Sequence, residues 1–293
     1  MKVKIFDAEL TVNDEYCTLC GQVPRKVENP YINMYVSLTN ACNANCKFCC
    51  NEKNACKKVD FDFDKFKYIL TELKNQIIIN KCSFTGGEPT SDIDLLRRCI
   101  STAKDIDSDI FTVINTNGMN LKSLEDFIGD IDSIALSIHH YDEIVNEGIF
   151  GTTTTASFDT IKSFKVPDRL HASCNLIKGY VYDPSTIKRY LDNIAQLGIT
   201  DVGFVSLMPA NNYCKENFVD FKDIDFSEVP SLYLSKEWNK KTYCRCRNYV
   251  YISEIGKVVK IYFRYYTDPT YSSSVLVFDG KNLREGFGGK III

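Results

Sequence analysis

The sequence lacks the features that mark several large classes of protein. With only fifteen glycines and eight prolines in 293 residues, no internal repeat and no Gly/Ser-rich linker, it is neither collagen-like nor of low complexity. It has no apolar run that approaches the ~18 residues of a membrane span. The N-terminal stretch meets acidic residues at once and has no apolar signal core, so we expect a cytoplasmic rather than a secreted protein.

An excess of charge of one sign is also missing. Lys and Arg total 35 against 38 Asp and Glu, and the net charge of −3 argues against a protein that coats nucleic acid. Histidine and tryptophan are scarce, with three copies and one, whereas cysteine is abundant, with thirteen. In a reducing compartment cysteines are buried core residues, nucleophiles or metal ligands rather than disulfide partners. Their spacing in the sequence must therefore show which of these roles each one has.

Short apolar runs alternate with amphipathic stretches over residues 32–209. The runs predicted as strands are Ile32–Leu38, Cys82–Thr85, Ile110–Ile114, Ile134–Ile138, Ala172–Ile177 and Val202–Leu207. The stretches predicted as helices are Phe61–Leu73, Ile93–Ala103, Leu121–Ile128, Ala156–Phe164 and Ser185–Leu197. Strands and helices that alternate at this spacing indicate parallel strands joined by right-handed crossovers. The sequence therefore predicts a barrel-like α/β domain.

The alternation stops after Pro209, and the rest of the chain is β-rich. The runs Tyr249–Ile252 and Val258–Phe263 predict an antiparallel pair, so we expect a small C-terminal β cap. The predicted division is an N-terminal extension with a CxxC over residues 1–31, the barrel-like domain over 32–209 and the cap over 210–293.

Three cysteines follow the first predicted strand within eight residues, in the spacing Cys42-x-x-x-Cys46-x-x-Cys49. Three thiolates on one short loop can bind three irons of a cubane cluster, whereas electron-transfer clusters take a fourth cysteine. The missing ligand leaves one iron open to a small molecule with its own chelating groups, and the amino and carboxylate groups of S-adenosylmethionine (SAM) supply such a chelate. Zinc usually closes four ligands and this loop has no histidine, so a zinc knuckle fits less well.

A second motif, Gly86-Gly87-Glu88, ends the second predicted strand. Two glycines let the backbone approach a ligand closely, and a carboxylate at this edge can accept hydrogen bonds from an ammonium group. The CxxxCxxC loop with Phe48 before its last cysteine, the later GGE and the strand–helix units together resemble the radical SAM superfamily. The resemblance covers roughly residues 32–209 and implies a partial (β/α)6 TIM-like barrel as the fold.

The resemblance also implies a set of site residues. Cys42, Cys46 and Cys49 would ligate a [4Fe–4S] cluster. Phe48 would pack near the adenine of SAM, and Glu88 with Gly86 and Gly87 would hold its methionyl group. Weaker matches, at strand ends where the superfamily places contacts to the methionine carboxylate, ribose or adenine, are Asn117, Ser137, Asn175 and Met208. The structural alternative for these four is an ordinary polar residue at the edge of the core or, for the methionine, plain packing.

Four further cysteines lie on either side of the predicted barrel. Cys17 and Cys20 precede it, Cys244 and Cys246 follow it, and four thiolates make a full zinc site or a closed auxiliary iron–sulfur cluster. Four unliganded thiols are the alternative. The remaining cysteines, among them Cys50, are interpreted as isolated buried or surface thiols.

Two of the three histidines, His139 and His140, follow the fourth predicted strand. They are candidates for substrate contact or proton transfer at the mouth of the barrel, and capping of the next loop is the structural alternative. The residues that act on the substrate are otherwise unassigned.

The resemblance implies that SAM is cleaved reductively at the cluster to a 5′-deoxyadenosyl radical, which abstracts hydrogen from a substrate. We expect that substrate to be a small polar metabolite or a peptide, the reductant to be a flavodoxin or ferredoxin, and no membrane or nucleic-acid partner. The predominantly basic stretch from Lys236 to Arg264 suits an anionic metabolite, with a solvated face as the alternative.

Three alternative functions stay open. A peptide-modifying maturase that works with a separate recognition protein is one, because recognition can come from another chain. The molybdopterin-precursor cyclase branch has a similar layout, and Gly288-Gly289 resembles its Gly-Gly tail, but the cysteine set of its cap is absent from this sequence. A non-catalytic iron–sulfur or zinc-knuckle binding protein is the alternative from another class, and the near-neutral charge and the complete motif set argue against it.

Overall fold

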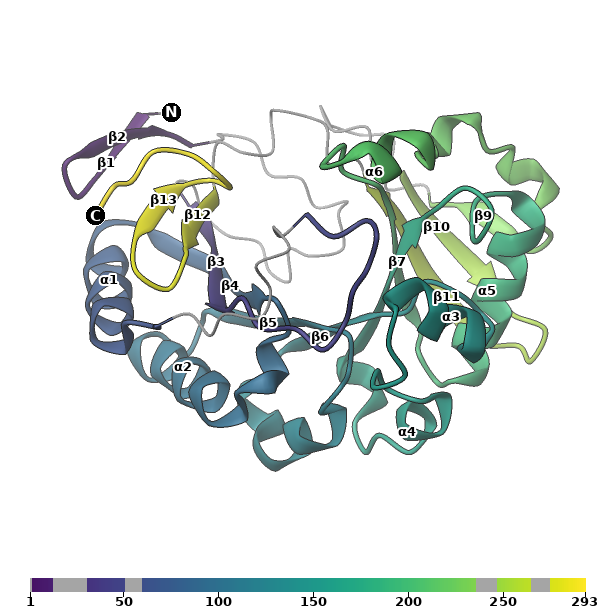
Figure 1. The fold of residues 1–293 in the computed structure, drawn as a ribbon, viewed down its shortest axis with the longest axis horizontal. Coiled ribbons are helices and arrows are strands. Elements are labelled where there is room, and N and C mark those ends of the chain that lie inside the picture. Colours follow the sequence, from purple (N-terminus) through teal and green to yellow (C-terminus); the bar gives the residue numbers. More distant parts are fainter. Residues whose placement is uncertain (1, 13–30, 51–59, 236–246, 265–274) are drawn as a thin grey trace.

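The computed structural model describes residues 2–12, 31–50, 60–235, 247–264 and 275–293 of the chain. Within these ranges one large sheet curves into an open arc, and helices lie along its outer side (Figure 1). No helix of the described ranges is long and apolar enough to span a bilayer. A separate antiparallel pair, β1 (Lys2–Ile5) and β2 (Ala8–Thr11), lies near the N-terminus.

Six parallel strands that pair in chain order form the middle of the sheet. They are β3 (Tyr31–Thr39), β4 (Ile78–Gly86), β5 (Phe111–Thr116), β6 (Ser133–Ser137), β7 (Leu170–Leu176) and β8 (Asp201–Ser206). Each overlaps an apolar run of the sequence, so the predicted α/β fold with a partial barrel is confirmed.

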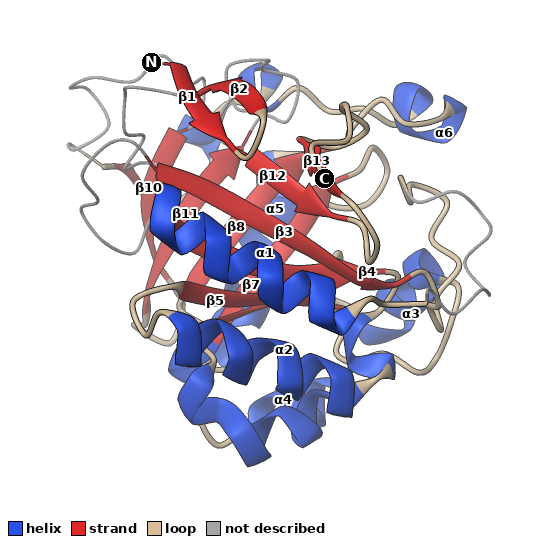
Figure 2. Cartoon of the chain, turned by 90° about the vertical axis from the view of Figure 1, so that its left-hand side faces the viewer, coloured by secondary structure: helices blue, strands red, loops and turns tan. Residues whose placement is uncertain are grey.

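The connections between the strands carry helices whose first turns are fixed by local side chains. The α-helices are α1 (Phe63–Gln76), α2 (Ile93–Ile106), α3 (Glu143–Phe150), α4 (Phe158–Lys162), α5 (Pro184–Gln196) and α6 (Asn212–Glu216). Asp62, Asp92 and Asp183 cap α1, α2 and α5, and each carboxylate accepts a hydrogen bond from a first-turn N–H. Helices α1 and α2 lie side by side across the outer face of the sheet (Figure 2).

One predicted helix takes a different form. Residues 121–128 belong to a 3-10 helix, η3 (Leu121–Asp130), which is interrupted at Phe127 by non-helical backbone angles. Its apolar side chains are buried at the helical spacing that the sequence predicted. Asn120, which precedes the helix, makes no side-chain capping hydrogen bond, so nothing there fixes an α-helical first turn. Short 3-10 turns also occur at η2 (Pro89–Ser91), η4 (Pro167–Arg169), η5 (Phe221–Asp223) and η6 (Phe226–Glu228).

The C-terminal strands join both ends of the central sheet. They are β9 (Leu232–Leu234), β10 (Arg247–Ile252), β11 (Val258–Arg264), β12 (Val275–Phe278) and β13 (Leu283–Glu285). The predicted antiparallel pair is confirmed as β10 and β11, and β11 also pairs in parallel with β8. At the other end β12 pairs in parallel with β3. The boundaries of the three predicted regions stay predictions.

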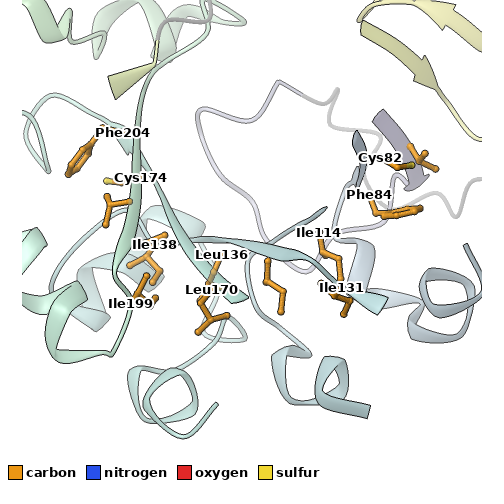
Figure 3. Packing of buried hydrophobic residues seen from close by; sticks show 14 of the residues in the cluster. Cys82, Phe84, Ile114, Ile131, Leu136, Ile138, Leu170, Cys174, Ile199 and Phe204 are labelled. Carbon is orange, nitrogen blue, oxygen red and sulfur yellow. The ribbon is translucent and has the colours of Figure 1, made fainter. Parts of the chain in front are cut away.

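The two faces of the sheet differ in chemistry. Direct cross-strand partners point to the same side of a sheet, so the register assigns each side chain to a face. The outer face is apolar and packs against the helices; labelled members in Figure 3 are Phe84, Ile114, Leu136, Cys174 and Phe204. This burial supplies the main stabilisation of the fold.

The opposite, concave side of the arc, which we call the inner face, is richer in polar groups. One row of partners on it runs from β6 to β11 through Ser137, Ser173, Gly203 and Tyr262. Along β7 the alternation of fully buried and half-buried residues follows this division, with Asn175 on the inner face two residues after Ser173. A polar inner face at the carboxyl end of parallel strands is where a barrel places its ligands.

Candidate functional site

The three-cysteine loop leaves the end of β3 and crosses the inside of the arc (Figure 1). Hydrogen bonds join its backbone to two other parts of the chain. The Asn45 N–H donates to the Phe150 carbonyl at 2.8 Å, and the Asn211 amide donates to the Lys47 carbonyl at 3.1 Å. The buried Cys214 thiol of α6 lies 3.5 Å from the Phe48 carbonyl. Residues from α3 and from the segment after β8 therefore hold the loop in place.

The three predicted cluster ligands lie within electrostatic reach of one another. Burial, together with the neighbouring Cys49 and Cys42, raises the pKa of Cys46 to about 12. Burial also raises the pKa of Cys42, although the Ala44 N–H, 3.4 Å from its sulfur, opposes this. Cys42 and Cys46 are half-buried and Cys49 is exposed. Without a metal the thiol form is favoured, and bound iron would favour the thiolate.

The donor set of this loop fits a cluster better than a single ion. It offers three thiols and no histidine, whereas a zinc knuckle closes four ligands. Three thiolates can each bind a different iron of a cubane, so Cys42, Cys46 and Cys49 fit a [4Fe–4S] cluster.

Gly86 and Gly87 allow the end of β4 to touch the start of the cysteine loop. Gly86 has φ +131°, and side chains at the two positions would overlap the backbone of Thr39 and Ala41. The Gly87 N–H donates to the Thr39 carbonyl at 2.6 Å, and the Glu88 N–H donates to the Ala41 carbonyl at 2.8 Å. The close approach that the glycines permit is thus made to the loop itself, and their contact with SAM stays a prediction.

Glu88 is buried at the centre of a hydrogen-bond network. Its Oε1 accepts from the Thr90 N–H at 3.0 Å, the Thr90 hydroxyl at 2.7 Å and the Thr116 hydroxyl at 2.6 Å. Its Oε2 accepts from the Asn117 N–H at 2.8 Å. Burial raises the pKa of this carboxyl, and the four donors oppose the rise because they stabilise the charged form. Glu88 therefore joins the ends of β4 and β5 through these four hydrogen bonds.

The Asn117 side chain has two protein partners. Its Nδ2 donates to Asn43 Oδ1 at 2.8 Å, and its Oδ1 accepts from the Met119 N–H at 3.0 Å. Asn43 in turn donates to the Thr154 carbonyl and hydroxyl at 3.1 and 2.8 Å. The structure therefore places Asn117 between Glu88 and the cysteine loop, and a direct contact to SAM stays a prediction.

The other predicted cofactor contacts lie around the carboxyl edge of the strands. Ser137 and Asn175 are half-buried on the inner face, and Met208 follows β8 with 39% of its surface exposed. Phe48 packs edge-on against the His139 ring, with 5.0 Å between centroids. None of these contacts has been tested against a ligand, so their roles stay predictions.

His139 is a buried, neutral side chain. Its Nδ1 accepts from the Asn175 N–H at 3.1 Å, and its ring also packs against Phe150 at 4.9 Å. Desolvation lowers its pKa to about 3. The His139 ring thus packs against Phe48 of the cysteine loop. A catalytic role for His139 stays a prediction.

His140 is a buried side chain that caps its own loop. Its Nδ1 accepts from the Asp142 N–H at 3.0 Å, and its ring stacks on Tyr141 with 4.0 Å between centroids. Burial lowers its pKa. The capping alternative foreseen for this histidine matches these contacts.

The predicted second metal site lies outside the described residues, because Cys17, Cys20, Cys244 and Cys246 fall in the omitted ranges. The side chains that sequence analysis missed are the braces of the site: Thr90, Thr116, Asn43, Asn211 and Cys214. Thr90 and Thr116 stand beside the GGE and Asn117, so their nearness in sequence was a usable signal. The contacts of Asn211 depend on the return of the chain after β8, which no local pattern encodes.

Comparison with known proteins identifies a domain in this chain. Residues 36–166 match the family model of the radical SAM superfamily. This part of the chain is a radical SAM domain. The superfamily consists of enzymes, and the match implies SAM and a [4Fe–4S] cluster as cofactors. The matched range contains the end of β3, the cysteine loop, the GGE and the strands β4, β5 and β6.

Two curated relatives cover similar shares of this chain. An S-adenosylmethionine-dependent nucleotide dehydratase of Fibrobacter sp. (strain UWH6) is 29% identical over 196 residues, which are 63% of this chain and 57% of the relative. A GTP 3',8-cyclase of Alkaliphilus metalliredigens is 27% identical over 212 residues, 65% of this chain and 62% of the relative. The chain thus spans less than two thirds of the length of either.

Among solved structures, Streptococcus suis SuiB bound to S-adenosylmethionine matches with a TM-score of 0.58 and 14% identity, over 89% of this chain and 62% of SuiB. SuiB bound to the precursor peptide SuiA matches with a TM-score of 0.53 and 19% identity, over 63% of this chain and 41% of that one. At such identities the likeness concerns the fold alone, and it agrees with a radical SAM partial barrel.

Proposed function

We propose that this radical SAM enzyme cleaves SAM reductively and abstracts hydrogen from a small polar metabolite. The observation that supports this most is the direct union of the two motifs, in which the Gly87 and Glu88 N–H groups bond the backbone that leads into Cys42. Cys42, Cys46 and Cys49 would hold a [4Fe–4S] cluster here, and that cluster would supply the electron for the reductive cleavage of SAM.

The residues of the chain have positioning roles in this proposal. Cys42, Cys46 and Cys49 hold the cluster, and Phe48 with its His139 support limits access of water to it. Glu88 keeps the ends of β4 and β5 in register with the loop. The half-buried polar side chains of the inner face, such as Ser137 and Asn175, orient SAM.

For the substrate we propose a nucleotide or a similar phosphorylated metabolite. The two curated relatives are named for reactions of nucleotides, one a dehydratase and the other a cyclase of GTP. The basic stretch that runs from Lys236 into β11 has the charge to receive phosphate. A peptide substrate, recognised with the help of a separate protein, is the second candidate, because the fold match with SuiB includes a complex with its precursor peptide.

The proposal requires a low-potential electron donor, and we place the protein in the cytoplasm with a flavodoxin or ferredoxin as its partner. The first test is anaerobic reconstitution with iron and sulfide, reduction with dithionite and measurement of 5′-deoxyadenosine. Cys42→Ala, Cys46→Ala and Cys49→Ala should each lose the cluster absorbance and all SAM cleavage.

Cys50→Ala is the matched control, since Cys50 adjoins Cys49 on the same exposed stretch but stands outside the motif. It should retain iron and activity. Formation of 5′-deoxyadenosine by Cys46→Ala would refute the proposal. The substrate class is then tested by whether GTP, CTP, UTP or ATP, or a peptide encoded beside the gene, stimulates 5′-deoxyadenosine formation.

We also propose a second metal site at Cys17, Cys20, Cys244 and Cys246, holding zinc or an auxiliary iron–sulfur cluster. Its support is the number of thiols, four, which is a complete ligand set for either. Elemental analysis of the Cys42/Cys46/Cys49→Ala triple variant tests it. A folded triple variant with neither zinc nor iron would exclude the site.

A further inference from the structure

Two asparagine side chains join the cysteine loop to the strand ends that surround Glu88. Asn43 follows Cys42 in the loop, and Asn117 follows β5. Asn117 Nδ2 donates to Asn43 Oδ1 at 2.8 Å, and the Asn117 backbone N–H donates to Glu88 Oε2 at 2.8 Å. The two asparagines are 74 positions apart in the chain, so their contact depends on the order of β3, β4 and β5 in the sheet.

The segment that follows α3 fixes both asparagines from another side. Asn43 Nδ2 donates to the Thr154 carbonyl at 3.1 Å and to the Thr154 hydroxyl at 2.8 Å. The Ala156 N–H donates to the Asn117 carbonyl at 3.3 Å. The Asn43 amide is therefore bonded through its oxygen and through its nitrogen, and neither end can turn without the loss of a hydrogen bond.

The peptide group after Asn43 points its N–H at a predicted cluster ligand. The Ala44 N–H donates to Cys42 Sγ at 3.4 Å, and Asn43 Oδ1 lies 4.0 Å from the same sulfur. This N–H shares its peptide plane with the Asn43 carbonyl, so its direction is set by the backbone angles of Asn43. Because the Asn43 side chain is held at both ends, the direction of the Ala44 N–H is held as well.

A hydrogen bond to a ligand sulfur acts on the reduction potential of an iron–sulfur cluster. Reduction adds a negative charge, and an N–H aimed at the sulfur stabilises the more negative state. Cys42 is half-buried, so water screens this interaction less than it would on an open surface. The Ala44 N–H therefore favours reduction of a cluster that Cys42 holds.

A third asparagine holds the same loop at a different place. Asn211 Nδ2 donates to the Lys47 carbonyl at 3.1 Å and lies 3.5 Å from the Cys49 carbonyl. These contacts hold the far end of the loop and do not involve the peptide group that faces Cys42. Asn211 thus offers a matched control for a change that merely loosens the loop.

We propose that Asn43 and Asn117 are positioning residues that raise the reduction potential of the cluster by aiming the Ala44 N–H at the Cys42 sulfur. The inference rests on the cluster of the proposed function. Neither asparagine is a ligand of iron in this proposal. Their removal should therefore change the potential and leave the three thiolates free to bind the cluster.

The test is a potentiometric titration of the reconstituted full chain in the absence of SAM, followed by the electron paramagnetic resonance signal of the reduced cluster. Asn43→Ala should move the midpoint to a lower potential. At the wild-type midpoint we expect the ratio of reduced to oxidised cluster to fall about tenfold, which is about 59 mV for one electron. Iron per chain should equal that of the wild type, because all three cysteines remain.

A double variant tests whether the two asparagines act as one unit. Asn117→Ala removes the donor to Asn43 Oδ1 and keeps the backbone N–H that Glu88 accepts. It should lower the midpoint as well, and Asn43→Ala combined with Asn117→Ala should lower it no further than Asn43→Ala alone. Shifts that add in the double variant would overturn the proposal, because the two side chains would then act separately.

Asn211→Ala should leave the midpoint where it is in the wild type. An unchanged midpoint in iron-loaded Asn43→Ala, or an equal shift in Asn211→Ala, would overturn the proposal. If Asn43→Ala binds no iron, Thr154→Val replaces it, since this variant removes one of the two acceptors of Asn43 Nδ2 and keeps the other. Thr154→Val should lower the midpoint by a smaller amount, and an unchanged midpoint there would equally overturn the proposal.

The titration uses neither SAM nor a substrate, so its outcome is separate from that of the cleavage assay. A wild type that holds the cluster and cleaves no SAM would refute the proposed function and leave the midpoints to decide this inference. A wild type that binds no iron after reconstitution would refute both.

Discussion

The two halves of the inner side use polar groups in opposite ways. Around β4 and β5, Glu88 and Asn117 are saturated by protein partners and hold one loop against another. Around β7, β8 and β11, the Tyr262 hydroxyl is hydrogen-bonded to His171, whose other ring nitrogen lies 2.7 Å from the Asp201 carboxylate at the start of β8. In the first half the polar groups join one backbone segment to another. In the second half they connect a buried ring to a carboxylate that is 44% exposed.

The halves also differ in how they are encoded. The cysteine loop and the GGE are contiguous motifs, and each side chain is placed by its neighbours in sequence. The Asp201–His171–Tyr262 chain joins residues that are 30 and 91 positions apart, and its geometry depends on strand order and register. A contiguous motif can therefore be recognised in the sequence, whereas a contact between distant strands depends on the order of the sheet.

The largest effect is expected when Glu88 is removed. Glu88→Ala withdraws the acceptor of four hydrogen bonds, and a bond to a charged group is worth roughly 1.5–3 kcal/mol. If Glu88 also contacts SAM, affinity for SAM falls by about ten- to a hundredfold, as measured by isothermal titration. Glu88→Gln is the matched variant. Its amide oxygen can replace Oε1 as the acceptor for Thr90 and Thr116, but its NH2 group would then face the Asn117 N–H, which needs an acceptor.

An unchanged SAM titration in a folded Glu88→Ala chain would show that this carboxylate is a brace only. In that case Glu88, in the half around β4 and β5, would bind only protein partners and would not make the contact to SAM that the GGE motif implies.

Sequence patterns predicted the six central strands because parallel strands that are buried on both faces read as continuous apolar runs. They also predicted the β10–β11 pair and the cysteine site. They did not predict that β11 and β12 would add in parallel to β8 and β3, because such pairing joins residues far apart in the chain. The interpretation of Gly86 and Gly87 was incomplete for the same reason: their backbone neighbours, Thr39 and Ala41, became visible only once β3 and β4 were aligned.

A pair of glycine substitutions gives the next largest effect and compares the halves directly. A Cβ at Gly87 would meet the backbone of Ala41, which cannot move without the cysteine loop. Gly87→Ala should cost about 1–3 kcal/mol in unfolding free energy and reduce iron loading. The atoms nearest to a Cβ at Gly203 would be the Tyr262 hydroxyl and Cζ, both at 2.4 Å, which belong to a side chain rather than to the backbone.

Gly203→Ala should therefore cost less stability and leave iron loading intact. Gly129→Ala, where a Cβ would meet nothing within 4 Å, is the control for the substitution itself. Urea denaturation measures the free energy of unfolding of each variant, and iron analysis measures its cluster content. Equal losses of iron in Gly87→Ala and Gly203→Ala would show that the two halves of the sheet do not differ in how rigidly they hold the cysteine loop.

The smallest expected effect concerns His139, at the end of β6 between the two halves. Its pKa is about 3 in the folded protein, because it is desolvated, against an ordinary value of 6.5. Between these values the unfolded chain binds a proton that the folded chain does not, so the free energy of unfolding decreases as the pH falls from 6.5 toward 3. One proton corresponds to a slope of at most about 1.4 kcal/mol per pH unit, or about 2 kcal/mol between pH 6.5 and 5.

His139→Asn can still offer an oxygen to the Asn175 N–H, and it removes the titrating group. It should lower stability at neutral pH through lost packing against Phe48 and Phe150, yet flatten the dependence between pH 6.5 and 5. His140→Asn is the control, since burial lowers the pKa of His140 less and its removal should flatten the curve less. A His139→Asn curve parallel to that of the wild type would mean that His139 takes up its proton without unfolding. The support beneath Phe48 would then be as adaptable as the half of the sheet that carries Tyr262.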